Sequence, residues 1–188
     1  TGFRIGQGGA QAKYDVKPDI TCFGKVIGGG LPIGAIGGSR AVMENLTPIG
    51  KVFHAGTLAG NPLATAAGLA ALNELTQDVY MELGARARAL STLLRDACLS
   101  AGIVAQFPVV GTLVGAFFGP NTPTNFDEAK QTDEKMYARL FHAMLAEGVA
   151  LAPGAYEALF VGLGHTDSVM QQLAERTEGA AHAAVRAQ

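Results

Sequence analysis

The sequence has little charge, little cysteine and no long apolar runs. Charged residues make up 16% of its 188 residues, and the net charge at pH 7 is -2, which argues against nucleic acid or an anionic membrane as a partner. No apolar run is long enough to span a membrane, and no signal segment opens the chain, which starts at Thr1. The two cysteines, Cys22 and Cys98, lie far apart in apolar surroundings, so we expect buried, reduced thiols and a cytoplasmic protein.

The motifs of several enzyme classes are missing as well. Gly6–Gly9 is rich in glycine, but Gln11 stands where a dinucleotide-binding loop needs glycine, and Ala12 precedes Lys13 where a P-loop needs glycine. The histidines do not have the spacing of metal ligands; they are His54, His142, His165 and His182. We therefore expect neither type of nucleotide loop and no metal.

The sequence is rich in glycine and in apolar residues. Its 25 glycines and 48% hydrophobic residues indicate loops that allow close approach, and a core sufficient for one ordinary domain or two small ones. A less apolar stretch at 76–80 interrupts a long helical pattern, so we place a domain boundary after residue 76. The predicted strands are 3–5, 20–23, 34–38, 103–107, 112–118, 149–151 and 159–161, and the predicted helices are 40–46, 62–100 with that interruption, 132–147 and 166 to the end.

The most unusual stretch is Thr21–Gly38, in which a single lysine stands between a buried strand pattern and a glycine triplet. Lysine is normally a surface residue, so Lys25 either turns its ammonium group to solvent at the strand end or has a chemical role. Burial among its apolar neighbours would favour the neutral amine, which can attack a carbonyl to form a Schiff base. Gly28–Gly30 allow positive φ and close approach of a ligand, and Pro32 fixes the exit from the turn.

A second stretch, Phe53–Pro62, combines small residues with a threonine just before a predicted helix. Its hydroxyl and backbone N–H groups could bind an anion at the start of the helix, and Thr57 would carry that role. The alternative is an ordinary helix entry in which Asn61 caps the first turn. The residue types alone favour the cap.

A carboxylate heads the last predicted strand. Glu157 follows Tyr156 and precedes the apolar residues 158–160. By default a glutamate at such a position is solvated.

Four segments together resemble one known family; they are Thr1–Arg4, Pro18–Gly38, Ala55–Pro62 and Pro153–Thr166. The second segment, with Lys25 and its glycines, resembles the lysine segment of the class III aminotransferases of fold type I. Ala-Gly-Thr-Leu-x-Gly-Asn-Pro in the third is similar to the family segment whose threonine binds the cofactor phosphate. Within the family the chain is most similar to the glutamate-1-semialdehyde 2,1-aminomutases, although His54 stands where Gln is common in them.

The resemblance implies an α/β fold, namely the C-terminal part of a PLP-dependent transferase of fold type I. Residues 1–76 would complete the large mixed or parallel sheet domain, and residues 77–188 would form a linking helix and a small α+β domain. In the family an Asp-Glu pair precedes the equivalent of Thr1 and is absent here. The chain therefore resembles an incomplete fragment, whose activity in isolation we do not expect.

The resemblance also implies the chemistry. Lys25 would bind pyridoxal 5'-phosphate covalently and act as the catalytic residue, Thr57 would bind the cofactor phosphate across a homodimer, and Glu157 would face a small amino acid substrate. The implied reaction is the isomerisation of glutamate-1-semialdehyde to 5-aminolevulinate in tetrapyrrole (porphyrin) biosynthesis, without an external amino donor.

Two alternatives stay open. An ω-aminotransferase of the same class, using an external donor, would share Lys25 and Thr57, and only the Gly-Thr-Leu sequence and the Glu157 segment argue against it. A non-catalytic fragment that merely packs against other chains would fit as well, because the chain lacks the rest of the cofactor site.

Overall fold

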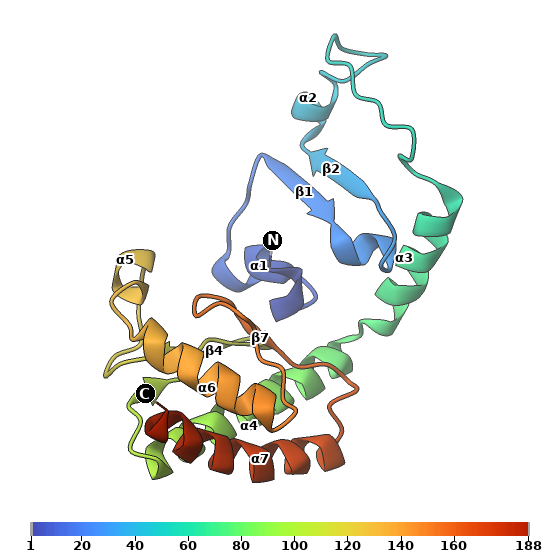
Figure 1. The fold of residues 1–188 in the computed structure, drawn as a ribbon. Helices are drawn as coiled ribbons and strands as arrows, with labels where there is room; N and C mark the ends of the chain where they lie inside the picture. Colours follow the sequence, from blue (N-terminus) through green and yellow to red (C-terminus); the bar gives the residue numbers. More distant parts are fainter. Residues whose placement is uncertain (1, 188) are drawn as a thin grey trace. The chain divides into compact units, whose positions relative to one another are not determined.

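The computed structural model describes residues 2–187, which form two compact units divided between Tyr80 and Met81 (Figure 1). Thr1 and Gln188, at the ends of the two expected domains, lie outside the described residues. The division falls within the long helix α4 (Gln77–Ser100). The domain boundary placed after residue 76 stays a prediction.

The first unit contains a hairpin of two antiparallel strands, β1 (Ile20–Gly24) and β2 (Gly34–Gly38). Both strands lie where the sequence predicts them. The 3-10 helix η2 (Lys25–Gly28) follows β1 directly, and the glycines after it turn the chain back toward β2 with left-handed φ values of 57° and 96° at Gly29 and Gly30.

Short helices and one longer helix complete the first unit: η1 (Phe3–Ile5), α1 (Gly9–Tyr14), α2 (Arg40–Met43) and α3 (Pro62–Glu74). The prediction of a strand at 3–5 is wrong. Gly2 has a left-handed φ of 68°, and the Ile5 N–H donates to its carbonyl at 3.0 Å, so the chain coils instead of extending. The Phe3 ring packs edge-on against Tyr80, whose hydroxyl donates to the Phe3 carbonyl.

The second unit packs α4, α6 (Glu134–Ala146) and α7 (Asp167–Arg186) around short antiparallel strands, and α6 lies beside α7 (Figure 1). β3 (Ala105–Gln106) pairs with β6 (Phe117–Phe118), and β5 (Leu113–Val114) lies between β4 (Val109–Val110) and β7 (Leu159–Phe160). A short helix, α5 (Phe126–Ala129), interrupts the long connection that leads to α6.

The second unit has a continuous apolar core. Leu94 of α4, Val114 of β5 and Met144 of α6 are fully buried in it. The helical pattern predicted for 62–100 is confirmed, but its break lies at residues 75–76 and not across 76–80, because α4 already begins at Gln77. The single strand predicted at 112–118 is two short strands. Between them the Gly115 N–H bonds to the Pro108 carbonyl at 2.9 Å in the register of both strand pairs, but Pro108 has no N–H to complete the ladder.

The prediction of a strand at 149–151 is also wrong. The Val149 N–H donates to the Met144 carbonyl at 2.8 Å and so completes the end of α6. The two cysteines differ from each other: Cys98 is buried as expected, whereas Cys22 on β1 is exposed, as is its neighbour Phe23 on the opposite face of the strand. Among residues 2–187, no helix combines the length and apolarity needed to cross a membrane.

Candidate active site

Lys25 is the first residue of η2, and its backbone is strained. Its φ is 54°, and within residues 2–187 only one other non-glycine residue, Asp15, has a positive φ. The left-handed conformation costs an L-residue about 1–2 kcal/mol, and residues held in it cluster at functional sites. The side chain itself is exposed, so the apolar burial considered from the sequence is not present in this chain.

Helix α3 holds the lysine turn through backbone contact. A Cβ added to Gly68 of α3 would lie 1.8 Å from the Ile27 carbonyl oxygen, and a Cβ added to Gly29 would lie 2.3 Å from the Ala67 carbonyl oxygen. Only glycine therefore fits at either position in this arrangement. The two backbones meet directly, so η2 packs against α3 through main-chain contact.

A side chain from α1 fixes the strand that leads into the turn. Gln11 Nε2 donates to Thr21 Oγ1 at 2.9 Å in a half-buried position. The sequence reasoning missed both this contact and the role of Gly68. Nothing local marks Gly68, because its partner Ile27 lies far away in the sequence.

Thr57 lies in the exposed loop that leads to α3. Within the described residues, its hydroxyl has no hydrogen-bond partner. Asn61 is the N-cap of α3: its Oδ1 accepts from the Ala64 N–H at 2.9 Å, while its Nδ2 donates to the Leu58 carbonyl at 3.0 Å. The cap predicted as the alternative is therefore present, and the same side chain also holds the loop next to Thr57. The two interpretations are compatible.

Lys25 and Thr57 are thus linked to one helix, the first through η2 and the second through the loop before the N-cap of α3. Glu157 belongs to the second unit. It is exposed, its N–H donates to the Gly154 carbonyl at 3.1 Å, and its carboxylate folds over Gly154, where a Cβ would lie 2.8 Å from Oε1.

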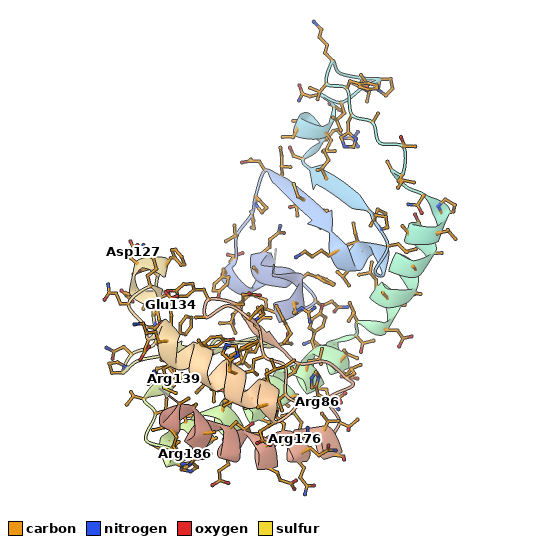
Figure 2. All side chains as sticks on the ribbon, viewed as in Figure 1. Arg86, Asp127, Glu134, Arg139, Arg176 and Arg186 are labelled. Carbon is orange, nitrogen blue, oxygen red and sulfur yellow. The ribbon has the colours of Figure 1, made fainter. Side chains whose placement is uncertain are left out.

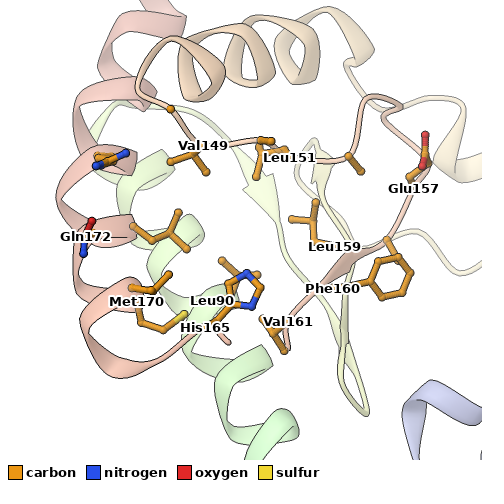
Figure 3. A pocket seen from close by; sticks show the side chains of 17 residues that line it. Leu90, Val149, Leu151, Glu157, Leu159, Phe160, Val161, His165, Met170 and Gln172 are labelled. Atoms are coloured by element: carbon orange, nitrogen blue, oxygen red, sulfur yellow. The ribbon is translucent and has the colours of Figure 1, made fainter. Parts of the chain in front are cut away.

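A cavity of about 550 Å³ lies in the second unit, with Glu157 at its edge (Figure 3). Its walls are mainly apolar side chains such as Leu151, Leu159 and Met170. Two rings also line it, those of Phe160 and His165, and the Nδ1 of His165 accepts from the Gly162 N–H at 2.9 Å. Among residues 2–187, no three His, Cys, Asp or Glu side chains gather closely enough to hold a metal ion.

Residues 1–175 match the aminotransferase class-III family, and the chain belongs to that family. Its fold is that of the PLP-dependent transaminases of fold type I.

Among its relatives is the glutamate-1-semialdehyde 2,1-aminomutase of Desulfosudis oleivorans, to which the chain is 48% identical over 184 residues, 97% of this chain and 42% of that protein. Its structure is similar to an ω-transaminase from Sphaerobacter thermophilus (TM-score 0.81, 26% identity, 95% of this chain and 42% of that one). It has the same fold as a glutamate-1-semialdehyde aminomutase from Pseudomonas aeruginosa in complex with PMP (TM-score 0.80, 24% identity, with the same coverage). The chain thus spans less than half the length of these proteins.

Proposed function

We propose that this chain is part of a glutamate-1-semialdehyde 2,1-aminomutase, which moves an amino group within glutamate-1-semialdehyde and releases 5-aminolevulinate for tetrapyrrole synthesis. The observation that carries the proposal is sequence identity. Five relatives that are 44–48% identical to the chain are all aminomutases of this name.

The residues present fit pyridoxal 5'-phosphate as the cofactor. Lys25 carries an exposed amine on a turn whose glycines have no side chain to block a flat ring. Thr57 offers a hydroxyl that makes no hydrogen bond within the described part of the chain. When bound, the cofactor would supply the electron sink for the reaction. The protein groups would bind it, orient it and move protons.

Each residue has a separate role in this proposal. Lys25 would hold the cofactor covalently and then, as a free amine, accept and return protons at Nζ. Thr57 Oγ1 would donate a hydrogen bond to a phosphate oxygen, and the Glu157 carboxylate would bind an ammonium group of the substrate.

A second copy of the chain is the partner we propose, with Thr57 acting across the dimer interface. Helix α3 supports this, because it is apolar on all sides, as in helices buried in a core. Ala64 and Gly68 are buried, but Leu63 and Leu69 are 74% and 61% exposed. The free, exposed thiol of Cys22 fits a reducing compartment such as the cytoplasm.

The activity is tested in a chimera in which residues 1–188 replace the matching segment of the Desulfosudis oleivorans aminomutase, with the parent enzyme as control. We expect 5-aminolevulinate from glutamate-1-semialdehyde without an added amino donor. A strict requirement for an external donor would support the ω-aminotransferase instead. An inactive chimera beside an active parent would support the non-catalytic alternative.

Borohydride reduction followed by peptide mapping tests the lysine, because it makes the bond between cofactor and amine permanent. We expect the label on Lys25 and its loss in Lys25→Ala. Arginine would not rescue the site, since its guanidinium stays protonated. A label on Lys13 or Lys17 in place of Lys25 would contradict the assignment.

The Thr57→Val substitution in the chimera tests the phosphate contact. Losing a hydrogen bond to a charged group costs about 1.5–3 kcal/mol. The dissociation constant of the cofactor should therefore rise roughly tenfold or more. Thr65→Val is the matched control, because the Thr65 hydroxyl bonds to the Asn61 carbonyl at the start of α3.

A hybrid dimer tests whether the contact crosses subunits. If it does, a dimer of one Lys25→Ala subunit and one Thr57→Val subunit should contain one doubly defective site and one intact site.

A further inference from the structure

Glu157 lies on a segment with no regular secondary structure of its own. The chain leaves α6 at Ala146 and enters β7 only at Leu159, and Glu157 is exposed near the end of this connection. A glutamate has a long side chain that loses much rotamer entropy when it is held in place. A carboxylate that binds a substrate group must nevertheless be placed to within about half an ångström. The segment therefore needs anchors close to Glu157.

Two tyrosines provide such anchors, and both attach the segment to α6. The Tyr137 hydroxyl donates to the Ala152 carbonyl, and the Tyr156 hydroxyl donates to Oε1 of Glu134. Glu134 and Tyr137 are three residues apart, so they lie on one face of α6. Figure 2 labels Glu134 at the start of that helix. Of the two anchored residues, Ala152 lies just before the turn that ends in Glu157 and Tyr156 lies within it.

The two anchors differ in their surroundings. Tyr137 is buried and packs edge-on against Phe118, with ring centroids 5.9 Å apart. Tyr156 is 39% exposed and packs edge-on against Phe126 at 5.6 Å. Tyr137 is therefore part of the core, whereas Tyr156 can lose its hydroxyl without disturbing the core.

The electrostatics agree with this geometry. The hydrogen bond to Glu134 is the main cause that raises the pKa of Tyr156. Burial, and to a smaller extent the Glu157 carboxylate, raises the pKa of Tyr137. The Glu157 carboxylate thus lies close enough to α6 for its charge to act on the Tyr137 hydroxyl.

We propose that Tyr156 and Glu134 are positioning residues, which clamp the turn 153–157 to the first turn of α6 and so hold the Glu157 carboxylate in place for the substrate. The clamp rests on the proposed function only in its last step, the binding of substrate by Glu157. Its structural part can be measured in this chain without activity.

Hydrogen exchange in the purified chain tests the structural part. The Glu157 N–H bonds to Gly154 within the turn, so it should exchange at least about fivefold faster in Tyr156→Phe and in Glu134→Gln, because a weakened anchor lets the turn open more often. Peptides from α7 should be unchanged in both variants. Tyr14→Phe is the matched control, since Tyr14 is an exposed tyrosine at the end of α1. Unchanged exchange at 153–158 in Tyr156→Phe would overturn the clamp.

Steady-state kinetics of the chimera test the functional part. Tyr156→Phe should raise KM about three- to tenfold with kcat within about twofold, because it disturbs the placement of a binding group. In a Glu157→Gln background the same substitution should have no further effect, as expected for residues that act through one another. Additive effects would overturn positioning through Glu157.

The remaining outcomes separate the two proposals. A chimera without aminomutase activity refutes the proposed function, and with it the role of the clamp in substrate binding. If Glu157→Gln leaves KM unchanged in an active chimera, Glu157 does not bind substrate and the functional part of the clamp is wrong. If Glu157→Gln raises KM but Tyr156→Phe does not, the proposed function stands and the clamp fails.

Discussion

At the scale of single residues, Lys25 combines two features that rarely occur together. Its side chain is exposed, which suits a lysine, but its backbone has a φ of 54°, which suits glycine. If only the fold mattered at this position, glycine would serve better. The strain is consistent with a residue kept for the chemistry of its amine.

Replacing Lys25 by glycine and by alanine should separate strain from chemistry. Alanine keeps the energetic cost of the left-handed conformation, whereas glycine removes it. The free energy of unfolding of the glycine variant should therefore be about 1 kcal/mol higher than that of the alanine variant. Urea titration followed by circular dichroism measures the difference. At Lys13, inside helix α1, the order should reverse, since glycine is the poorer helix former by about 1 kcal/mol.

Cys98 shows what burial does to a single titratable group. Burial raises the pKa of its thiol from 9.0 to about 11. The folded state therefore keeps the thiol neutral at pH values at which the unfolded chain ionises it. This contribution to stability is fully present below pH 9 and is lost as the pH rises through about 11.

We predict that the free energy of unfolding falls between pH 9 and 11 by about 2 kcal/mol on account of Cys98. In Cys98→Ala the fall between pH 9 and 10 should be much shallower, although the variant is less stable overall because of the cavity. Above pH 10 the buried Tyr137, whose pKa is also raised, adds a loss of the same sign. Urea titrations at a series of pH values give the slope, and equal slopes for the two proteins would refute the assignment.

At the scale of elements, α3 shows a conflict between propensity and packing. Glycine weakens a helix, yet Gly68 stands inside α3 because its Cα faces the Ile27 carbonyl of η2. The helix has no charged residue before Glu74 and begins at Pro62 behind the Asn61 cap, so its start is well determined locally. Its packing face is determined by the small residues that let the two backbones meet.

Gly68→Ala should therefore destabilise the first unit, although helix propensity alone would favour alanine by about 1 kcal/mol. The added Cβ would lie 1.8 Å from a backbone oxygen, so α3 or η2 must move and the turn of Lys25 with it. Gly179→Ala in α7 is the matched control, because a Cβ there meets nothing within 4 Å. We expect that variant to gain stability. Thermal unfolding measures both, and a more stable Gly68→Ala would contradict the contact.

At the scale of the whole molecule, the two units differ in how they are stabilised. The apolar core cluster lies entirely within residues 87–184. In the described part of the first unit, the buried hydrophobic residues are Ala64 and Tyr80. Large side chains such as Phe23, Phe53 and Leu63 are exposed there, and apolar exposure of this extent is typical of surfaces that bind other protein.

Residues 77–188 should fold on their own, whereas residues 1–76 should not. Residues 77–188 keep the complete core and should show a cooperative thermal transition and dispersed NMR signals. Residues 1–76 keep a two-stranded hairpin and one long helix, which are only marginally stable without further packing. This piece should therefore aggregate or remain unfolded. A stable, monomeric 1–76 piece would refute this prediction. The same experiment tests the domain boundary placed after residue 76.

Local chemistry made several elements predictable from the sequence. The helices at 134–146 and 167–186 carry their own apolar periodicity and caps, and the helix at 62–74 starts at Pro62 behind the Asn61 cap. The strands at 20–24 and 34–38 lie on either side of a glycine-rich turn. The segment 3–5 was not predictable, because its three residues extend or coil depending on the glycine before them and on Tyr80, far along the chain.

The candidate site also has residues that the sequence predicts and contacts that only the structure shows. Lys25 and Thr57 stand out in the sequence because their motifs are contiguous. Three features depend on residues distant in sequence: the contact of Gly68 with Ile27, the bond from Gln11 to Thr21, and the clamp between Tyr156 and Glu134. The sequence by itself determined which residues have the chemistry, since chemistry resides in residue type and short motifs. Only the tertiary structure decided what holds those residues in place, because contacts between distant segments arise when helices and turns pack together.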